Sequence, residues 1–253
     1  MKRNNSSWQK VAPWYHNLVR DEGHYYHEHL ILPNSTRLLN LKSGDSVLDV
    51  GCGQGVLAKA IPKDVNYVGI DSSSEMIKFA QRGDQNNLHK YLVLDVMREI
   101  RLNKNDFSHA VMMLSLQNME FPDKVFANIG RNLASSGKLL LVLNHPSFRI
   151  PRQSSWGIDE VNKLQYRRIN RYLSFLKIPI NINPANKNSS LTWSFHYPLS
   201  SYSEALLKNG FMIEKIEEWS SDKESQGKSA KMENRGRSEI PLFMAILARK
   251  ISN

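Results

Sequence analysis

The sequence predicts an α/β fold in which helices cover both faces of a largely parallel sheet. Two observations support this prediction. Between residues 45 and 145, short apolar runs alternate with amphipathic segments along the chain. The apolar runs are continuous stretches rich in Val, Ile and Leu, which is typical of parallel strands that are covered on both faces. A chain of 253 residues is also long enough to form one large hydrophobic core.

Each element predicted in this region is a short run bounded by turn residues. The first strand, SVLDV, covers residues 46–50. It is followed by a helix over 54–61, a strand over 66–70, a helix over 74–82, strands over 91–95 and 109–116, a helix over 122–133 and a strand over 137–145. Pro122 is well placed to open its helix, because proline is favoured in the first helical turn.

The regular alternation ends at Pro146. Five prolines lie between residues 146 and 198, and one helix is predicted there, over residues 159–176. The pattern returns with a helix over 201–210, which Gly210 ends as a C-cap, and with strands over 211–219 and 240–250. Residues 220–239, between these two strands, contain almost no apolar residue and are predicted to form a mobile loop.

The composition is that of a soluble globular protein, with 41% hydrophobic and 23% charged residues. No apolar run approaches the roughly 20 residues that a membrane-spanning helix needs, and no apolar segment follows the basic start MKRNN. Cys52 is the single cysteine, so it can form neither an intramolecular disulfide nor a multi-cysteine zinc site. We therefore expect a cytoplasmic protein without a membrane contact.

The positive charge is concentrated in one segment. The chain has a net charge of +10, which fits nucleic acid, an anionic membrane surface, an anionic substrate or simple solubility. Residues 145–200 contain eight Lys and Arg residues but two acids, so +6 of the excess lies in this segment.

A glycine-rich turn follows the first strand. Its glycines are Gly51, Gly53 and Gly55, a tighter spacing than the G-x-G-x-x-G of dinucleotide-binding proteins. Asp49 lies two residues before the first glycine, where a carboxylate would repel a phosphate and attract an ammonium group. No Lys follows as a P-loop would require, so a phosphate site is not indicated.

Two further acids lie at the ends of the next strands. Asp71, about 20 residues past the glycine turn, can accept hydrogen bonds from both hydroxyls of a ribose. Asp95 can accept a hydrogen bond from the exocyclic amine of an adenine. A ligand that combines a ribose, an adenine and an ammonium-bearing tail is S-adenosylmethionine (SAM).

These residues resemble the three cofactor motifs of class I SAM-dependent methyltransferases, of the methyltransferase type 11 kind. The motifs are VLDVGCGQG, the GID that ends in Asp71 and the LVLD that ends in Asp95. The resemblance implies a doubly wound, Rossmann-like sheet of seven strands with the last one antiparallel, and S-adenosylhomocysteine as a product. The cofactor-binding residues we expect are Asp49, Gly51, Cys52, Gly53, Gly55, Asp71, Ser72, Met76, Asp95, Val96 and Leu114.

The end of the fourth strand, LSLQNMEFP, should face the methyl group in such a fold. Gln117 and Asn118 there can hydrogen-bond a substrate or cap a helix. The Asn-Pro-Pro-aromatic motif of enzymes that methylate amino groups of nucleic-acid bases is absent. His145, after the fifth strand, is the best-placed candidate general base, although its position favours a capping or core role. The further substrate-binding candidates are His24, Arg149, Arg152 and Trp156, of which the two arginines could clamp a carboxylate or a phosphate.

The expected organisation has three parts. Residues 1–44 form a helical lid, residues 45–144 and 200–253 form the SAM-binding core, and residues 145–199 form a substrate cap inserted after the fifth strand. His24, His27 and His29 in the lid do not share one helical face, so no metal site is expected.

The sequence thus favours a SAM-dependent methyltransferase acting on a small aromatic or anionic metabolite. Two alternatives stay open at this point. The basic segment could bind RNA in an RNA methyltransferase, or the chain could be a SAM-binding regulator without catalytic activity.

Overall fold

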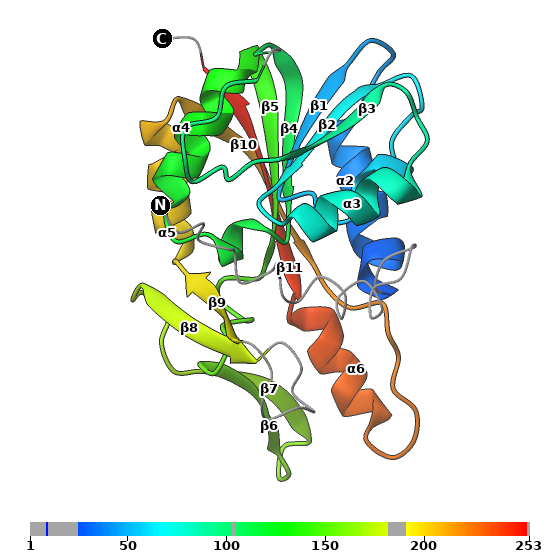
Figure 1. Ribbon diagram of the computed structural model, residues 1–253. Helices are drawn as coiled ribbons and strands as arrows, with labels where there is room; N and C mark the ends of the chain where they lie inside the picture. Colours follow the sequence, from blue (N-terminus) through cyan, green and yellow to red (C-terminus); the bar gives the residue numbers. More distant parts are fainter. Residues whose placement is uncertain (1–8, 10–24, 103–104, 182–190, 252–253) are drawn as a thin grey trace.

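The computed structural model describes residues 9, 25–102, 105–181 and 191–251 (Figure 1). Its centre is a seven-stranded sheet with the strand order β10-β11-β5-β4-β1-β2-β3. The strands are β1 (Ser46–Val50), β2 (Asn66–Asp71), β3 (His89–Val93), β4 (Phe107–Met113), β5 (Leu133–Asn144), β10 (Phe211–Trp219) and β11 (Phe243–Lys250).

The sheet is parallel except for its last strand. β1 pairs in parallel with both β2 and β4, and β11 runs antiparallel to both β5 and β10. The chain moves outward from β1 to β3 and then returns to the other side of β1 to form β4. This reversal creates a crevice at the carboxyl ends of β1 and β4, where doubly wound folds bind their ligands. The predicted fold class is confirmed.

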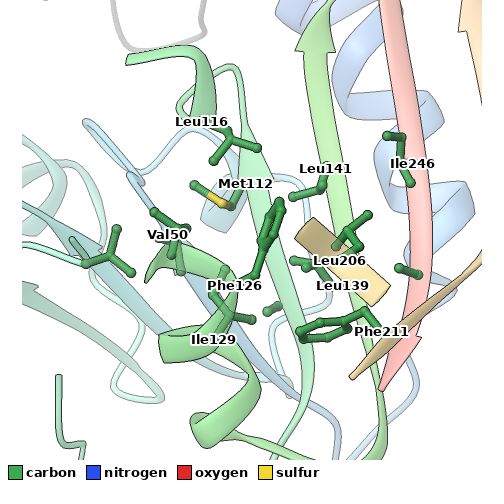
Figure 2. Packing of buried hydrophobic residues seen from close by; sticks show 14 of the residues in the cluster. Val50, Met112, Leu116, Phe126, Ile129, Leu139, Leu141, Leu206, Phe211 and Ile246 are labelled. Atoms are coloured by element: carbon green, nitrogen blue, oxygen red, sulfur yellow. The ribbon is translucent and has the colours of Figure 1, made fainter. Parts of the chain in front are cut away.

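Helices cover both faces of the sheet (Figure 1). The covering helices are α2 (Leu32–Leu39), α3 (Ser74–Gly83), α4 (Pro122–Asn132) and α5 (Leu199–Lys208), whereas a further helix, α6 (Ala230–Glu239), lies beyond one end of the sheet. Successive residues of β5 belong to opposite cores, because strand side chains alternate between faces. Leu139 and Leu141 pack with α4 and α5 on one face, as Figure 2 shows, whereas Leu140 packs with α2 and α3 on the other.

The predicted helix over 54–61 is wrong in extent. Only a short 3-10 turn, η3 (Leu57–Lys59), forms there. Gly55 still has a φ of +79°, so the left-handed turn takes up the first residues of the segment, and Pro62 follows the last. Too few residues are left for an α-helix. The third and fourth strands also end earlier than predicted, at Val93 and Met113.

The predicted helix over 159–176 is also wrong, because this segment belongs to two hairpins. β6 (Ser154–Asp159) pairs with β7 (Leu164–Ile169), and β8 (Leu176–Asn181) pairs with β9 (Leu191–His196). Leu164 and Tyr166 alternate with Gln165 and Arg167, which suits a strand, although Ile169 departs from this period of two. The Asp159 carboxylate accepts the backbone N–H of Val161 and of Asn162, and this turn reverses the chain.

The predicted loop over 220–239 contains the helix α6. Its composition gives little sign of a helix because it has no apolar stripe. Contacts from distant residues stabilise it: Gly236 lies directly against Gln165 of β7, and Asn234 accepts the backbone N–H of Ser225. The two hairpins and α6 lie together beyond one end of the sheet (Figure 1).

The region before β1 is described only from residue 25 onward, with the addition of Gln9. It contains a short π-helix, η2 (His27–Ile31), followed by α2. His24 and most of the expected lid lie outside the described residues, so the three-part organisation stays a prediction. None of the helices in the described part of the chain has the length and apolar character needed to cross a bilayer.

Candidate active site

The glycine turn after β1 has the left-handed backbone that its sequence suggests. Gly51, Gly53 and Gly55 have φ values of +74°, +55° and +79°. The backbone N–H groups of Gly51 and Cys52 both donate to the Ile70 carbonyl, at 2.8 and 3.1 Å. The turn is therefore fastened to the end of β2, and its main chain lies close to the crevice.

Asp71 holds this turn from the end of β2. Its Oδ2 accepts the Gly53 N–H at 3.1 Å, and its Oδ1 accepts the Ser73 N–H at 2.8 Å. Burial raises the pKa of the Asp71 carboxyl, although these backbone hydrogen bonds oppose the shift. A carboxylate has about four acceptor positions, so Asp71 keeps capacity for the hydroxyls of a ligand.

Asp49 is a buried acid with an unused oxygen. Asp49 is only 2% exposed, and its Oδ2 accepts a hydrogen bond from the Tyr67 hydroxyl at 2.7 Å. Its Oδ1 has no hydrogen-bond partner within the described structure. Burial raises the pKa of Asp49 to about 7, and the charge of Asp71 adds to the shift. Since an unpaired buried polar atom destabilises the fold, this oxygen suits a cationic donor.

The end of β4 is strained and tightly tied. Leu114 has a φ of +53°, which is unusual for a branched side chain, and its N–H donates to the Val142 carbonyl at 2.8 Å. Ser115 Oγ donates to the Val50 carbonyl at 2.7 Å, which joins the ends of β4 and β1. Backbone strain of this kind is often kept at functional sites.

These elements enclose a cavity of about 320 Å³ at the carboxyl ends of the parallel strands. Most of the expected cofactor-binding residues line it, namely Asp49, Gly51, Cys52, Gly53, Asp71, Ser72, Met76, Asp95, Val96 and Leu114. Asn118, a substrate-binding candidate, lines it as well. The tertiary structure thus brings together residues that are spread over 70 positions of the sequence.

Several lining residues were not among the expected site residues. They are His27, Gln54, Val56, Ile70, Leu94, Met97, Met113, Ser115, Met119, Glu120, Phe121, Trp193 and Phe195. Trp193 and Phe195 come from β9, 138 or more positions after the glycine turn. Two aromatic residues spaced by two on a strand share one face, and this spacing was the signal that could have indicated them.

The aromatic side of the cavity is fixed by Lys177 and Tyr197. Lys177 Nζ lies 5.2 Å from the centre of the Trp193 ring and 3.2 Å from Oε2 of Glu120. The Tyr197 hydroxyl donates to the Glu120 carbonyl at 2.6 Å. These contacts fasten the β8–β9 hairpin to the segment between β4 and α4.

Other expected residues do not line the cavity. They are Gly55, Gln117, His145, Arg149, Arg152 and Trp156. Gly55 instead packs beneath the turn against Tyr91. Trp156 packs in the insertion, where the Arg167 guanidinium lies 5.3 Å from its ring centre. The expected pair of arginines therefore does not form a clamp in this cavity.

His145 has a structural role. Its Nδ1 accepts the Ser147 N–H at 3.2 Å, so its Nε2 carries the proton and donates to Oε1 of Glu218 at 2.6 Å. Both ring nitrogens are thus used, and the residue is only 3% exposed. Burial lowers the pKa of His145. The prediction that His145 is a general base finds no support in this geometry. Among the described residues, no three His, Cys, Asp or Glu side chains form a group that could hold a metal ion.

Comparison with known proteins gives the same picture. Residues 48–141 match the family model of a methyltransferase domain. The chain is 32% identical over 108 residues to a demethylmenaquinone methyltransferase of Lactobacillus johnsonii. This aligned region covers 40% of this chain and 44% of that protein. It is 25% identical over 154 residues to a ubiquinone biosynthesis O-methyltransferase of Coxiella burnetii, which covers 59% of this chain and 66% of that protein. The match thus spans less than two thirds of either relative.

Solved structures share the fold. The crystal structure of a SAM-dependent methyltransferase from Mesorhizobium loti superimposes with a TM-score of 0.67 at 23% identity, and covers 85% of this chain and 96% of that chain. The matched family region includes the glycine turn, Asp71 and Asp95. The unpaired Asp49 oxygen and the open glycine turn fit the cofactor of this family. Residues 48–141 therefore match a methyltransferase domain, and the chain shares the fold of a SAM-dependent methyltransferase.

Proposed function

We propose that this chain transfers the methyl group of SAM to a small, neutral acceptor with an aromatic or otherwise apolar ring. One observation carries this proposal: the carboxylates of Asp49, Asp71 and Asp95 line the cavity together with aromatic and Met side chains. Among the described residues that line it, there is no Lys or Arg. Such a cavity favours a cationic cofactor and a neutral partner.

Each of three carboxylates binds a different part of the cofactor. Asp49 Oδ1 accepts from the ammonium group, Asp71 accepts from the ribose hydroxyls, and Asp95 accepts from the adenine amine. When bound, SAM supplies a methyl group on a positively charged sulfonium. The protein then needs mainly to align the acceptor and to exclude water, since methyl transfer is an in-line displacement.

The apolar side supplies the alignment. Phe195 is buried, whereas Phe121 and Trp193 are exposed enough to contact a second molecule. Met113 and Met119, which also line the cavity, adapt to irregular ring shapes. An anionic acceptor would be repelled by Asp49, Asp71 and Asp95, whereas the charge of Glu120 is paired with Lys177. The names of the two curated relatives refer to quinones, whose rings are flat and apolar, and this supports an aromatic acceptor.

A methylation screen tests the proposal directly. The purified chain is incubated with SAM that carries a labelled methyl group and with matched phenols, catechols, hydroquinones, amines and aromatic carboxylates. We expect labelled product from neutral dihydroxy or monohydroxy aromatics and little from the carboxylates. Binding of S-adenosylhomocysteine without turnover of any acceptor would instead support a SAM-binding regulator without catalytic activity. Turnover confined to RNA would contradict the proposal of a small-molecule acceptor.

Replacement of Trp193 should affect the acceptor and not the cofactor. We expect Trp193→Ala to raise the KM for the acceptor about ten-fold, because an aromatic contact and its buried area are lost. The affinity for S-adenosylhomocysteine, measured by titration calorimetry, should change less than two-fold. Trp156→Ala, which removes a tryptophan that does not line the cavity, is the matched control. An equal increase of the KM in both variants would contradict a specific role of Trp193 in acceptor binding.

The ionisation of Asp49 should make cofactor binding depend on pH. An ammonium group needs the ionised carboxylate, and the pKa of Asp49 in the protein is about 7. Affinity for S-adenosylhomocysteine should therefore fall about ten-fold for each pH unit below 7, since one proton must be released. Without ligand, the stability of the fold depends on pH in the opposite direction. The folded protein holds this proton more tightly than the unfolded chain, so stability decreases as the pH rises toward 7.

Calorimetric titrations between pH 5.5 and 7.5 measure this linkage, a range in which the ligand amine stays protonated. Asp49→Asn should bind weakly at every pH, with a flat profile. A variant that keeps the wild-type slope would assign the titration to another group, such as Asp71, whose pKa burial also raises.

A further inference from the structure

Gln9, near the start of the chain, contacts the beginning of α3. Its Oε1 accepts the Ser74 N–H at 3.0 Å and the Ser73 hydroxyl at 3.2 Å, and its Nε2 donates to Ser74 Oγ at 3.1 Å. Gln9 is half-buried, so these hydrogen bonds are partly shielded from water. One side chain therefore uses both of its polar atoms on two neighbouring residues that lie 64 and 65 positions further along the chain.

These contacts satisfy the start of the helix. The first N–H groups of an α-helix have no acceptor within the helix. Ser73 is the N-cap of α3, and its Oγ accepts the Met76 N–H at 3.3 Å. Gln9 supplies the acceptor for the Ser74 N–H. Asp71 accepts the Ser73 N–H at 2.8 Å. A distant glutamine and the candidate ribose-binding acid thus hold adjacent amides of the same helix start.

The start of α3 is also part of the cavity wall. Ser72 and Met76, on either side of the two serines, line the cavity. The carboxylate of Asp71, which lines it as well, joins this helix start to the Gly53 N–H of the glycine turn. Gln9 is not among the described residues that line the cavity. It is therefore connected to the cofactor site only through the helix start and Asp71.

We propose that Gln9 is a positioning residue of the cofactor site, which fixes the start of α3 so that the Asp71 carboxylate is oriented before the ligand binds. The inference rests on the proposed role of Asp71 as the acceptor for the ribose hydroxyls. Without Gln9, the Ser74 N–H loses its acceptor and the two serines become more mobile. A ligand then has to order this segment as it binds, and the cost of that ordering lowers its affinity.

Two replacements separate the hydrogen bonds of Gln9 from its packing. Gln9→Met keeps the length of the side chain and removes every polar contact. Gln9→Glu keeps oxygen acceptors for the Ser74 N–H and the Ser73 hydroxyl, and a carboxylate is also favourable near the N-terminus of a helix. If the polar contacts position the site, the Glu variant should retain the function that the Met variant loses.

Titration calorimetry of the full chain with S-adenosylhomocysteine tests this role. We expect Gln9→Met to bind about five- to ten-fold more weakly than the wild type, and Gln9→Glu to stay within about three-fold of it. Gln85→Met is the matched control, because Gln85 is an exposed glutamine beyond the other end of α3, and it should bind as the wild type does. Thermal unfolding of each variant confirms that it folds.

A second measurement separates positioning from a general effect on stability. If Gln9 acts through Asp71, its loss should matter little once that acid is absent. Gln9→Met should therefore weaken binding by less than about two-fold in an Asp71→Ala background, because the two effects are not additive. An equal loss in both backgrounds would show that Gln9 acts independently of Asp71, and would overturn the proposal.

Hydrogen exchange measures the same coupling from the other side. S-adenosylhomocysteine should slow the exchange of the Ser74 N–H in the wild type, and should slow it less in Gln9→Met, since coupling between two sites is reciprocal. Wild-type affinity in Gln9→Met would overturn this inference alone and leave the cofactor site in place. A wild-type chain that binds no S-adenosylhomocysteine would overturn the cofactor site and this inference together.

Discussion

Asp71→Ala should weaken the binding of S-adenosylhomocysteine at least 100-fold. The substitution removes the acceptor for two ribose hydroxyls, and each hydrogen bond to a charged group contributes about 1.5–3 kcal/mol. It also releases the Gly53 and Ser73 N–H groups, which the carboxylate now holds at 3.1 and 2.8 Å. The glycine turn should therefore become less ordered as well. Titration calorimetry of the folded variant measures the loss.

Two comparisons make this result specific. Asp71→Asn keeps one acceptor oxygen and should lose less affinity than Asp71→Ala. Asp64→Ala, an exposed acid on the connection before β2, should bind as the wild type does. Unchanged affinity in Asp71→Ala would remove this residue from the cofactor site. Preferential binding of NAD by the wild-type chain would contradict the cofactor itself.

Gly51→Ala should destabilise the protein more than Gly53→Ala. Both residues have a positive φ, which costs an L-residue about 1–2 kcal/mol. At Gly51 a Cβ would also lie 2.5 Å from Cβ of Ser115, and that overpacking should add about 1–3 kcal/mol. At Gly53 a Cβ would meet no atom within 4 Å, since it points into open space.

Urea unfolding and ligand titration together test this difference. Gly51→Ala should lower the free energy of unfolding by about 2–5 kcal/mol, the sum of the two effects. Gly53→Ala should stay closer to the wild type in stability but should bind S-adenosylhomocysteine less well, because its methyl group enters the space beside the ligand. Gly53→Val should fold and lose the cofactor. Equal stability losses at the two positions would show that the contact with Ser115 relaxes without cost.

The cofactor half of the site could be predicted from the sequence because its residues act through local geometry. Gly51, Gly53 and Gly55 adopt the left-handed backbone that their residue type permits, and Asp71 follows a buried strand whose end it marks. Parallel strands bring such ends to one edge of the sheet, whatever the length of the connections. Ten of the eleven expected cofactor residues therefore line the cavity, and Gly55, the exception, supports the turn from below.

The aromatic side of the cavity depended on contacts between distant residues. The sequence pattern predicts a helix over residues 159–176, yet the pairing of β6 with β7 outweighs this local preference. The same is true of α6, whose polar residues form a helix where they meet β7. Trp193 and Phe195 reach the cavity only because β9 pairs with β8 and because Lys177 and Tyr197 tie that hairpin to Glu120.

His145 illustrates the difference most clearly. Its position directly after β5 is set by the sequence, and that position suggested a general base. Its role is decided by its partners in the folded chain: Nε2 donates to Glu218, 73 residues away, and Nδ1, the nitrogen that a base would use, accepts the Ser147 N–H. The sequence by itself determined the fold and the cofactor side, because backbone conformation and strand ends are local properties. The tertiary structure alone decided the aromatic side of the cavity, since side-chain partners from distant segments are chosen only when the chain is packed.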